Sequence, residues 1–232
     1  MTFVLAIDQG TTSTRAILFD KNRRPAFISQ QELTQYYPQS GWVEHDAEEI
    51  WASVMATVHD VMKKASCKPE NIVSIGITNQ RETTVIWDRN SGIPIFRAIV
   101  WQDRRTASFC DTLRSAEHEA MITDKTGLLI DPYFSATKVN WLLENVEGAR
   151  LAAQKGKLLF GTIDSYLIWK MTNGASHVTD ATNAARTMMY NIVEGKWDPE
   201  ICDLLDIPMT ILPKVNDCAS NFGVTKCFGG NI

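Results

Sequence analysis

Paired cysteines are missing from this sequence of 232 residues. The five cysteines are scattered, odd in number and never spaced as Cys-x-x-Cys. This pattern argues against a metal-ligand cluster, and a disulfide framework is rare in a chain of this size. We therefore expect reduced thiols in a cytosolic protein, most of them serving as packing residues.

Long apolar runs and a surplus of one charge are missing as well. No apolar run approaches the roughly 18 residues that a membrane span needs, and the N-terminus lacks the basic and apolar regions of a signal peptide. The net charge of −4 provides no general attraction to nucleic acid or to an anionic membrane. We expect a cytoplasmic protein without nucleic-acid or membrane partners, in which phosphate binding depends on local geometry.

The N-terminal segment predicts three strands whose short connections make them antiparallel neighbours. A helix is expected from about Asp46, an N-cap residue with Glu49 three positions later, as in a capping box. Two more strands follow, the first a continuous apolar run typical of a sheet interior. The predicted strands are Phe3–Asp8, Thr14–Asp20, Pro25–Glu32, Ile72–Thr78 and Thr83–Trp87.

Beyond residue 100 the pattern becomes more helical. Apolar residues recur at helical spacing from Val139 to Val146, and Ile163–Lys170 predicts a short buried helix. The proline-containing end of the chain, from Asp198, predicts short helices and loops. A β-β-β-α-β core followed by a helical insertion indicates an α/β domain with a mixed sheet, and not a doubly wound nucleotide fold.

Four consecutive hydroxyl residues follow a glycine after the first strand. Such a turn lets backbone amides approach a phosphate closely, although a plain β-hairpin remains an alternative. The loop is neither a Walker A loop nor a GxGxxG turn. A carboxylate at the strand end could hold magnesium, and an arginine could add a fixed positive charge. The segment is Asp8-Gln9-Gly10-Thr11-Thr12-Ser13-Thr14-Arg15.

A second group of polar and aromatic residues could bind a ligand. Arg81 and Glu82 interrupt two apolar segments, which suggests mutual pairing and a polar ligand because buried unpaired charges are costly. The alternative is a solvated hairpin tip with a surface ion pair. Trp101 and Tyr133 stand in polar segments, where an aromatic face could cover the C–H groups of a hydroxylated carbon skeleton. Taken alone, a tryptophan such as Trp101 is more often a core residue than a ligand contact, and Tyr133 is similarly ambiguous.

Taken together, these segments resemble the carbohydrate kinase family that includes glycerol kinase, xylulokinase and gluconokinase. The resemblance runs in order from Phe3 nearly to the C-terminus and is greatest for the glycerol kinase branch. The phosphate loop is shared loosely across the family, whereas the Gln-Arg-Glu-Thr and Trp-Gln-Asp-Arg-Arg-Thr pieces are more specific. The segments are Asp8–Arg15, Gly41–Asp46, Thr78–Thr83, Trp101–Thr106 and Asp131–Ser135.

The resemblance implies a ribonuclease-H-like, actin-type ATPase domain, one of two that close over ATP and substrate. It implies glycerol as the substrate, ATP and Mg²⁺ as cofactors, and a homo-oligomer for the full-length protein. By position, glycerol would bind Arg81, Glu82, Trp101 and Tyr133, the nucleotide would bind Thr11, Thr12, Ser13 and Arg15, and the metal would lie near Asp8.

The resemblance also implies a missing part. Full members of the family have a second domain whose Gly-Asp-Gln-Gln segment supplies the Asp that takes the proton from the attacking hydroxyl. No such segment occurs here, so residues 1–232 are expected to be the N-terminal substrate-binding domain, cut before the general base that lies beyond Ile232. General-base assistance is typically worth 10²–10⁴-fold. We expect this chain alone to be inactive and to bind ATP weakly.

The leading hypothesis is an ATP-dependent polyol kinase that makes sn-glycerol 3-phosphate in its full-length form. A kinase for another small polyol or sugar is the alternative within the same class. A non-catalytic kinase half, acting as a ligand-binding or interaction module, is the alternative of another class, because this fold also scaffolds other functions.

Overall fold

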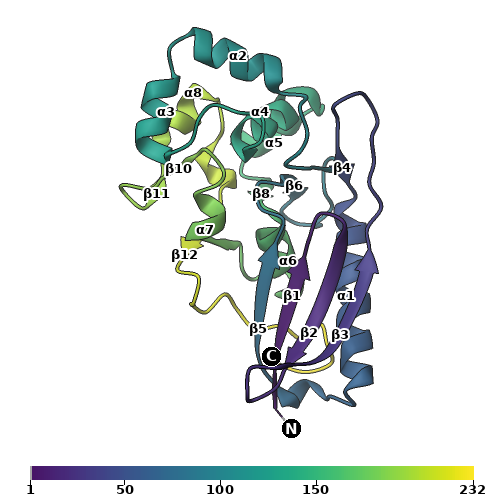
Figure 1. Cartoon of the computed structure of the whole chain (residues 1–232). Helices are drawn as coiled ribbons and strands as arrows, with labels where there is room; N and C mark the ends of the chain where they lie inside the picture. The colour runs from purple at the N-terminus through teal and green to yellow at the C-terminus, as the bar shows by residue number, and fades with distance from the viewer. Residues whose placement is uncertain (1) are drawn as a thin grey trace.

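The computed structural model describes residues 2–232, and a mixed four-stranded sheet forms its lower part in Figure 1. The strand order is β3-β2-β1-β5, with β1 antiparallel to β2 and parallel to β5. The predicted mixed sheet is therefore confirmed. The strands are β1 (Phe3–Gln9), β2 (Ser13–Phe19), β3 (Pro25–Glu32) and β5 (Ile72–Asn79).

Helix α1 (Ala47–Lys64) packs on β2 and β3, and α6 (Ile163–Met171) lies against β5. Leu5 and Ile7 of β1 point to this side and are fully buried. Alternation along the strand sends Asp8 to the opposite, more open face, together with its cross-strand neighbour Arg15. The sheet thus has a helix-covered side that forms a core and an open side that carries the polar end of β1.

A second apolar core lies within the upper, mainly helical part of Figure 1. Its helices are α2 (Ala107–Ser115), α3 (Glu119–Thr126), α4 (Ser135–Asn145), α5 (Ala149–Gln154) and α8 (Pro199–Leu204). Short ladders join the parts: β4 (Glu44–His45) with β7 (Ala98–Ile99), β6 (Val85–Asp88) with β8 (Leu158–Gly161), β9 (Val178–Asp180) with β12 (Lys214–Asn216), and β10 (Tyr190–Asn191) with β11 (Lys196–Trp197). Helix α7 (Ala181–Ala184) follows β9, and 3₁₀ turns occupy Pro69–Asn71 and Met209–Ile211.

Local sequence signals located most of these elements correctly. Asp46 caps α1 by accepting hydrogen bonds from the backbone amides of Glu48 and Glu49. The reciprocal half of the capping box is absent among residues 2–232, because the Glu49 carboxylate accepts from the Tyr36 hydroxyl at 2.6 Å. The predicted helix Ile163–Lys170 is confirmed as α6.

One strand prediction is wrong in its position. The apolar run Ile72–Thr78 suggested a sheet interior, but β5 is an edge strand and Val73 is 65% exposed. Only alternate side chains of β5 pack toward α6, so an apolar run overstated its burial. The segment predicted as Thr83–Trp87 forms β6 (Val85–Asp88), which pairs with β8 outside the main sheet.

From residue 2 onward, none of the helices combines the length and apolar character needed to cross a membrane.

Candidate acceptor and phosphate site

The predicted phosphate loop connects β1 to β2 and is closed by a hydrogen bond from Gly10 N to Ser13 O at 2.9 Å. A Cβ at Gly10 would lie 3.2 Å from the same oxygen, so a glycine suits this tight turn. Thr11 and Thr12 lie between β1 and β2, and within residues 2–232 their backbone amides donate to no backbone carbonyl. These amides are donors that an anion could use.

The side-chain hydroxyls of this loop differ in how freely they can donate a hydrogen bond to a phosphate. Thr11 Oγ1 accepts a hydrogen bond from Trp101 Nε1 at 2.9 Å, which leaves its own proton available for donation. Ser13 is 8% exposed, and its hydroxyl accepts from Gln30 Nε2 at 3.2 Å. Thr12 is exposed. The predicted phosphate contacts remain predictions, with Thr12 the most accessible of the three side chains.

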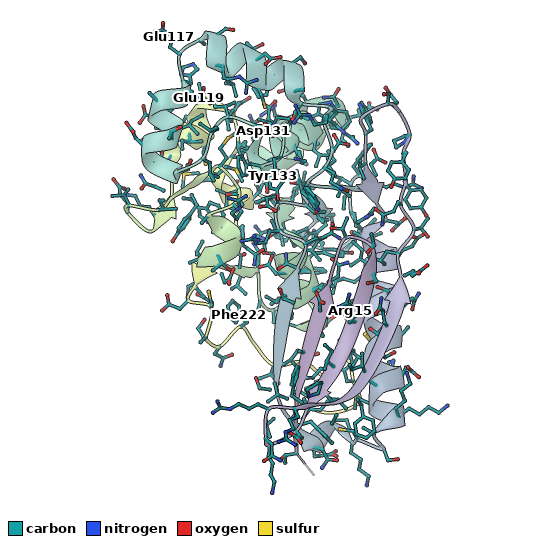
Figure 2. The ribbon with its side chains drawn as sticks, viewed as in Figure 1. Arg15, Glu117, Glu119, Asp131, Tyr133 and Phe222 are labelled. Carbon is teal, nitrogen blue, oxygen red and sulfur yellow. The ribbon has the colours of Figure 1, made fainter. Side chains whose placement is uncertain are left out.

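Asp8 and Arg15 are cross-strand neighbours on the open face of the sheet, where Figure 2 labels Arg15. Arg15 Nη1 lies 3.6 Å from Asp8 Oδ2, and the two side chains are 47% and 37% exposed, respectively. Within residues 2–232, no group of three or more His, Cys, Asp or Glu side chains could enclose a metal ion. A lone accessible carboxylate still fits Mg²⁺, which is commonly held by one or two carboxylates with phosphate oxygens and waters.

Trp101 and Tyr133, two of the residues predicted to bind the acceptor, form an aromatic pair. Their ring centroids are 5.2 Å apart with an interplanar angle of 54°. Figure 2 shows Tyr133 between the helical part and the sheet. The loop before α4 is held by the buried Lys138, whose Nζ donates to the carbonyls of Pro132, Tyr133 and Phe134. Burial lowers the pKa of Lys138 from 10.5 to about 8.

Arg81 and Glu82 lie on a strained turn at the end of β5. Glu82 has a left-handed backbone with φ of 63°, and Thr83 N donates to Arg81 O at 2.7 Å, as in a γ-turn. The Glu82 carbonyl accepts from Ser135 Oγ at 2.9 Å and from Thr84 Oγ1 at 3.1 Å. A non-glycine residue in this conformation is uncommon and is found preferentially at functional sites, where surrounding contacts enforce it.

The expected mutual pairing of Arg81 and Glu82 is wrong. Glu82 is paired instead with Arg186, whose Nε lies 2.7 Å from Glu82 Oε1. The Glu82 side chain is only 3% exposed, so the alternative of a solvated hairpin tip also fails. Arg81 is exposed and has no ion-pair partner within the described residues. The γ-turn separates the two side chains and leaves a cation free at the site.

A polar network connects this turn to the phosphate loop. The side chain of Gln80 donates to Gln9 Oε1 at 3.1 Å and lies 3.1 Å from His45 Nδ1. His45 Nε2 lies 2.8 Å from Gln35 Oε1, and the amide of Gln35 donates to the Thr11 carbonyl at 2.8 Å. Burial lowers the pKa of His45 from 6.5 to about 4, so the ring is neutral and can accept at Nδ1. The two loops therefore form one connected unit.

Sequence reasoning missed His45 and Arg186. His45 lies on a two-residue strand, and Arg186 follows α7, separated from Glu82 by 104 positions. The available signal was the lone charge of Arg186 within the segment Ala184-Ala185-Arg186-Thr187-Met188-Met189. A single arginine among small and apolar residues indicates a buried partner.

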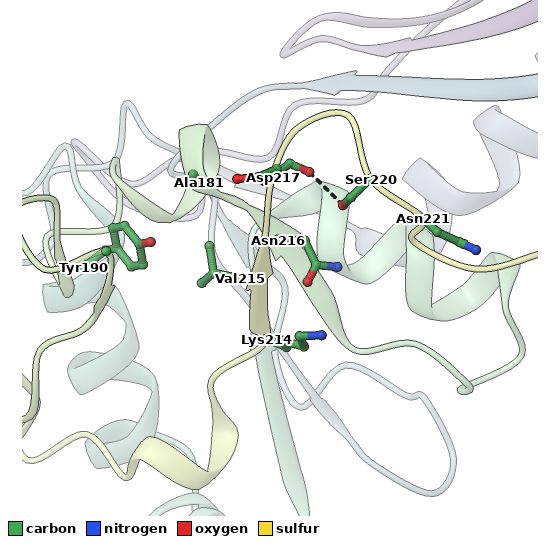
Figure 3. Close-up of a pocket in the computed structure, with 9 residues that line it drawn as sticks. Ala181, Tyr190, Lys214, Val215, Asn216, Asp217, Ser220 and Asn221 are labelled. Atoms are coloured by element: carbon green, nitrogen blue, oxygen red, sulfur yellow. Dashed lines mark hydrogen bonds between the residues drawn. The ribbon is translucent and has the colours of Figure 1, made fainter.

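One cavity lies away from the predicted site, whereas a second hollow includes one of its residues. A cavity of about 500 Å³ lies beside β12, and residues that line it, among them Tyr190, Lys214 and Asn221, are drawn in Figure 3. None of the residues predicted to bind glycerol, nucleotide or metal lines it. A hollow of about 660 Å³ has the predicted acceptor residue Tyr133 and its neighbour Arg186 in its wall.

Similar proteins agree in family and fold. The glycerol kinase of Roseobacter denitrificans is 60% identical over 226 residues, which cover 97% of this chain and 46% of that protein. The glycerol kinase of Brucella ovis is 60% identical over 232 residues, covering 99% and 47%, respectively. The crystal structure of Plasmodium falciparum glycerol kinase with ADP has a TM-score of 0.92 at 34% identity, covering 97% of this chain and 45% of that one.

A more distant structure extends the comparison. The xylulose kinase from Lactobacillus acidophilus has a TM-score of 0.85 at 25% identity, covering 97% of this chain and 43% of that one. These matches confirm the predicted actin-type ATPase fold. The chain spans about half the length of the curated relatives it matches. The model of the N-terminal domain of the FGGY family of carbohydrate kinases matches residues 3–228, and the chain therefore belongs to this family.

Proposed function

We propose that this domain supplies the acceptor-binding side of the active site of an ATP-dependent glycerol kinase. The full-length enzyme would convert ATP and glycerol to ADP and sn-glycerol 3-phosphate. The observation that carries the proposal is the hydrogen bond between Trp101 and Thr11, at 2.9 Å. It joins an aromatic acceptor site directly to a loop suited to phosphate. Relatives that are 60% identical are named glycerol kinases, which supports glycerol as the acceptor.

The side chains suit a small triol. Arg81 provides an unpaired cation, and Glu82 Oε2 accepts no hydrogen bond from the described part of the chain. An arginine and a carboxylate can together donate to and accept from neighbouring hydroxyl groups. Trp101 and Tyr133 can cover the carbon skeleton. A short acceptor uses all four residues at once.

The nucleotide side of the site follows from the same geometry. The free amides of Thr11 and Thr12 are suited to phosphate oxygens, and Ser13 and Arg15 border the loop. Asp8 would hold Mg²⁺, whose charge would offset that of the phosphates. As the family resemblance implies, the general base would come from a second domain, which would close over this site.

The test is an acceptor panel with the full-length protein that contains this domain. Glycerol, erythritol and xylulose are compared by acceptor-dependent ADP formation, and we expect glycerol to have the highest kcat/KM. Arg81→Ala should raise the glycerol KM by about 10–100-fold, because a charged hydrogen bond to substrate is lost. The exposed Arg24→Ala is the matched control. A higher kcat/KM for xylulose would favour a sugar kinase, and no turnover with any acceptor would favour a non-catalytic module.

A further inference from the structure

We infer that Arg186 is a positioning residue for the acceptor site: it holds the carboxylate of Glu82 and one side of the Tyr133 ring. This inference rests on the proposed function, because it concerns how the proposed acceptor residues are held. Arg186 follows α7, far in sequence from both residues.

The first observation is the ion pair between Arg186 and Glu82. Arg186 Nε is 2.7 Å from Glu82 Oε1, and the Glu82 side chain is 3% exposed. Within residues 2–232, no other cationic side chain lies within 4.0 Å of this carboxylate. A buried carboxylate requires such a partner, and removing it would leave an uncompensated charge. Arg186 thereby fixes one oxygen and leaves Oε2 for a ligand.

The second observation is the position of the guanidinium against the aromatic residues. Its carbon lies 5.6 Å from the centroid of Tyr133 and 5.0 Å from that of Phe134. Cation–π attraction is effective at these distances. One arginine therefore contacts the carboxylate on one side and the ring that faces Trp101 on the other.

The third observation is that the segment carrying Arg186 is anchored on both sides. Asn183 Oδ1 accepts from Asn79 Nδ2 at 3.0 Å, just before the turn that carries Glu82. The Thr187 carbonyl accepts from the backbone amide of Ala136 in α4 at 2.8 Å. Since Arg186 lies between these anchors, its side chain is presented in a fixed direction. The strained backbone of Glu82 makes such support necessary.

The role differs from ligand binding, and kinetics can separate the two. Arg186 side-chain exposure is 30%, but its polar contact is with Glu82, so its effect on the acceptor should pass through that carboxylate. Removing Arg186 should then raise the acceptor KM and leave the ATP KM unchanged. Once Glu82 is replaced, removing Arg186 should have no additional effect on the acceptor KM.

The experiment measures steady-state kinetics and thermal unfolding of the full-length protein and its variants. Arg186→Gln should raise the glycerol KM about 10–100-fold, as misplacement of a binding group does. Arg186→Lys should give an intermediate value, because it restores charge without the planar geometry. Arg150→Gln is the matched control, since Arg150 is also partly buried, at 21% exposed, and ion-paired, but lies on α5.

The outcomes separate this inference from the proposed function. An unchanged glycerol KM in a folded Arg186→Gln variant, or full additivity with Glu82→Gln, would overturn the positioning role and leave the kinase proposal intact. If another polyol is the better acceptor, the glycerol assignment fails, and the same KM comparison is made with that polyol. A wild-type protein without acceptor-dependent turnover would overturn both.

Discussion

The hydrogen bond from Trp101 Nε1 to Thr11 Oγ1 predicts that the acceptor and phosphate sites are energetically coupled. Trp101→Phe removes the donor and keeps an aromatic ring opposite Tyr133, and Thr11→Val removes the acceptor at nearly constant volume. A hydrogen bond of this kind contributes about 1 kcal/mol net. Each single substitution should therefore lower kcat/KM about fivefold through this bond, since 1.4 kcal/mol corresponds to a factor of ten.

A double-mutant cycle in the full-length protein measures the coupling. Once either partner has been removed, removal of the other costs little, so the coupling free energy in kcat/KM should be about 1 kcal/mol. The control is a second cycle that pairs Trp101→Phe with Thr12→Val. Its coupling free energy should be close to zero, because Thr12 is exposed and makes no hydrogen bond to Trp101. Additivity of Trp101→Phe and Thr11→Val to within about 0.3 kcal/mol would refute the coupling.

Three more predictions concern stability and the isolated domain. Because burial holds the pKa of His45 at about 4, the unfolded chain binds this proton first, and stability falls as pH drops from 6.5 toward 4. Between pH 7 and pH 5, urea unfolding should show wild type losing about 2 kcal/mol more than His45→Gln, and equal losses would contradict this. The Arg105 side chain is fully buried, pairs with Asp103 and Glu44 at 2.8 Å each, and its guanidinium carbon lies 3.8 Å from the Trp42 centroid. Arg105→Met should cost about 3–5 kcal/mol in the free energy of unfolding, and a loss below about 1 kcal/mol would refute a stabilising role for these two buried ion pairs. The isolated 232-residue chain should form no ADP in the presence of ATP and glycerol. Steady glycerol-dependent turnover would contradict the proposal that a second domain supplies the general base.

Local patterns were sufficient for the main elements. The N-cap at Asp46 located α1, and short turns predicted the antiparallel order of the first strands. The two-residue strand β4 could not be predicted, because its pairing with β7 joins residues far apart in sequence. The edge position of β5 was also hidden, since apolar character does not report how many neighbours a strand has.

The residues of the candidate site were easier to find than their contacts. Unusual polar residues in apolar surroundings singled out Arg81 and Glu82, but adjacency in sequence suggested the wrong ion pair. The γ-turn separates them, and the partner of Glu82 comes from 104 positions away. Only the folded chain brings Arg186 to this carboxylate, and only the resemblance to a family indicated a triol.

The most direct measurement is a crystal structure of the full-length protein with glycerol and a non-hydrolysable ATP analogue. We expect glycerol hydroxyls within about 3 Å of the Arg81 guanidinium and Glu82 Oε2, with its carbon chain against Trp101 and the terminal phosphate at the Thr11–Thr12 amides. Glycerol bound away from these residues, for example in the cavity beside Lys214, would contradict the account.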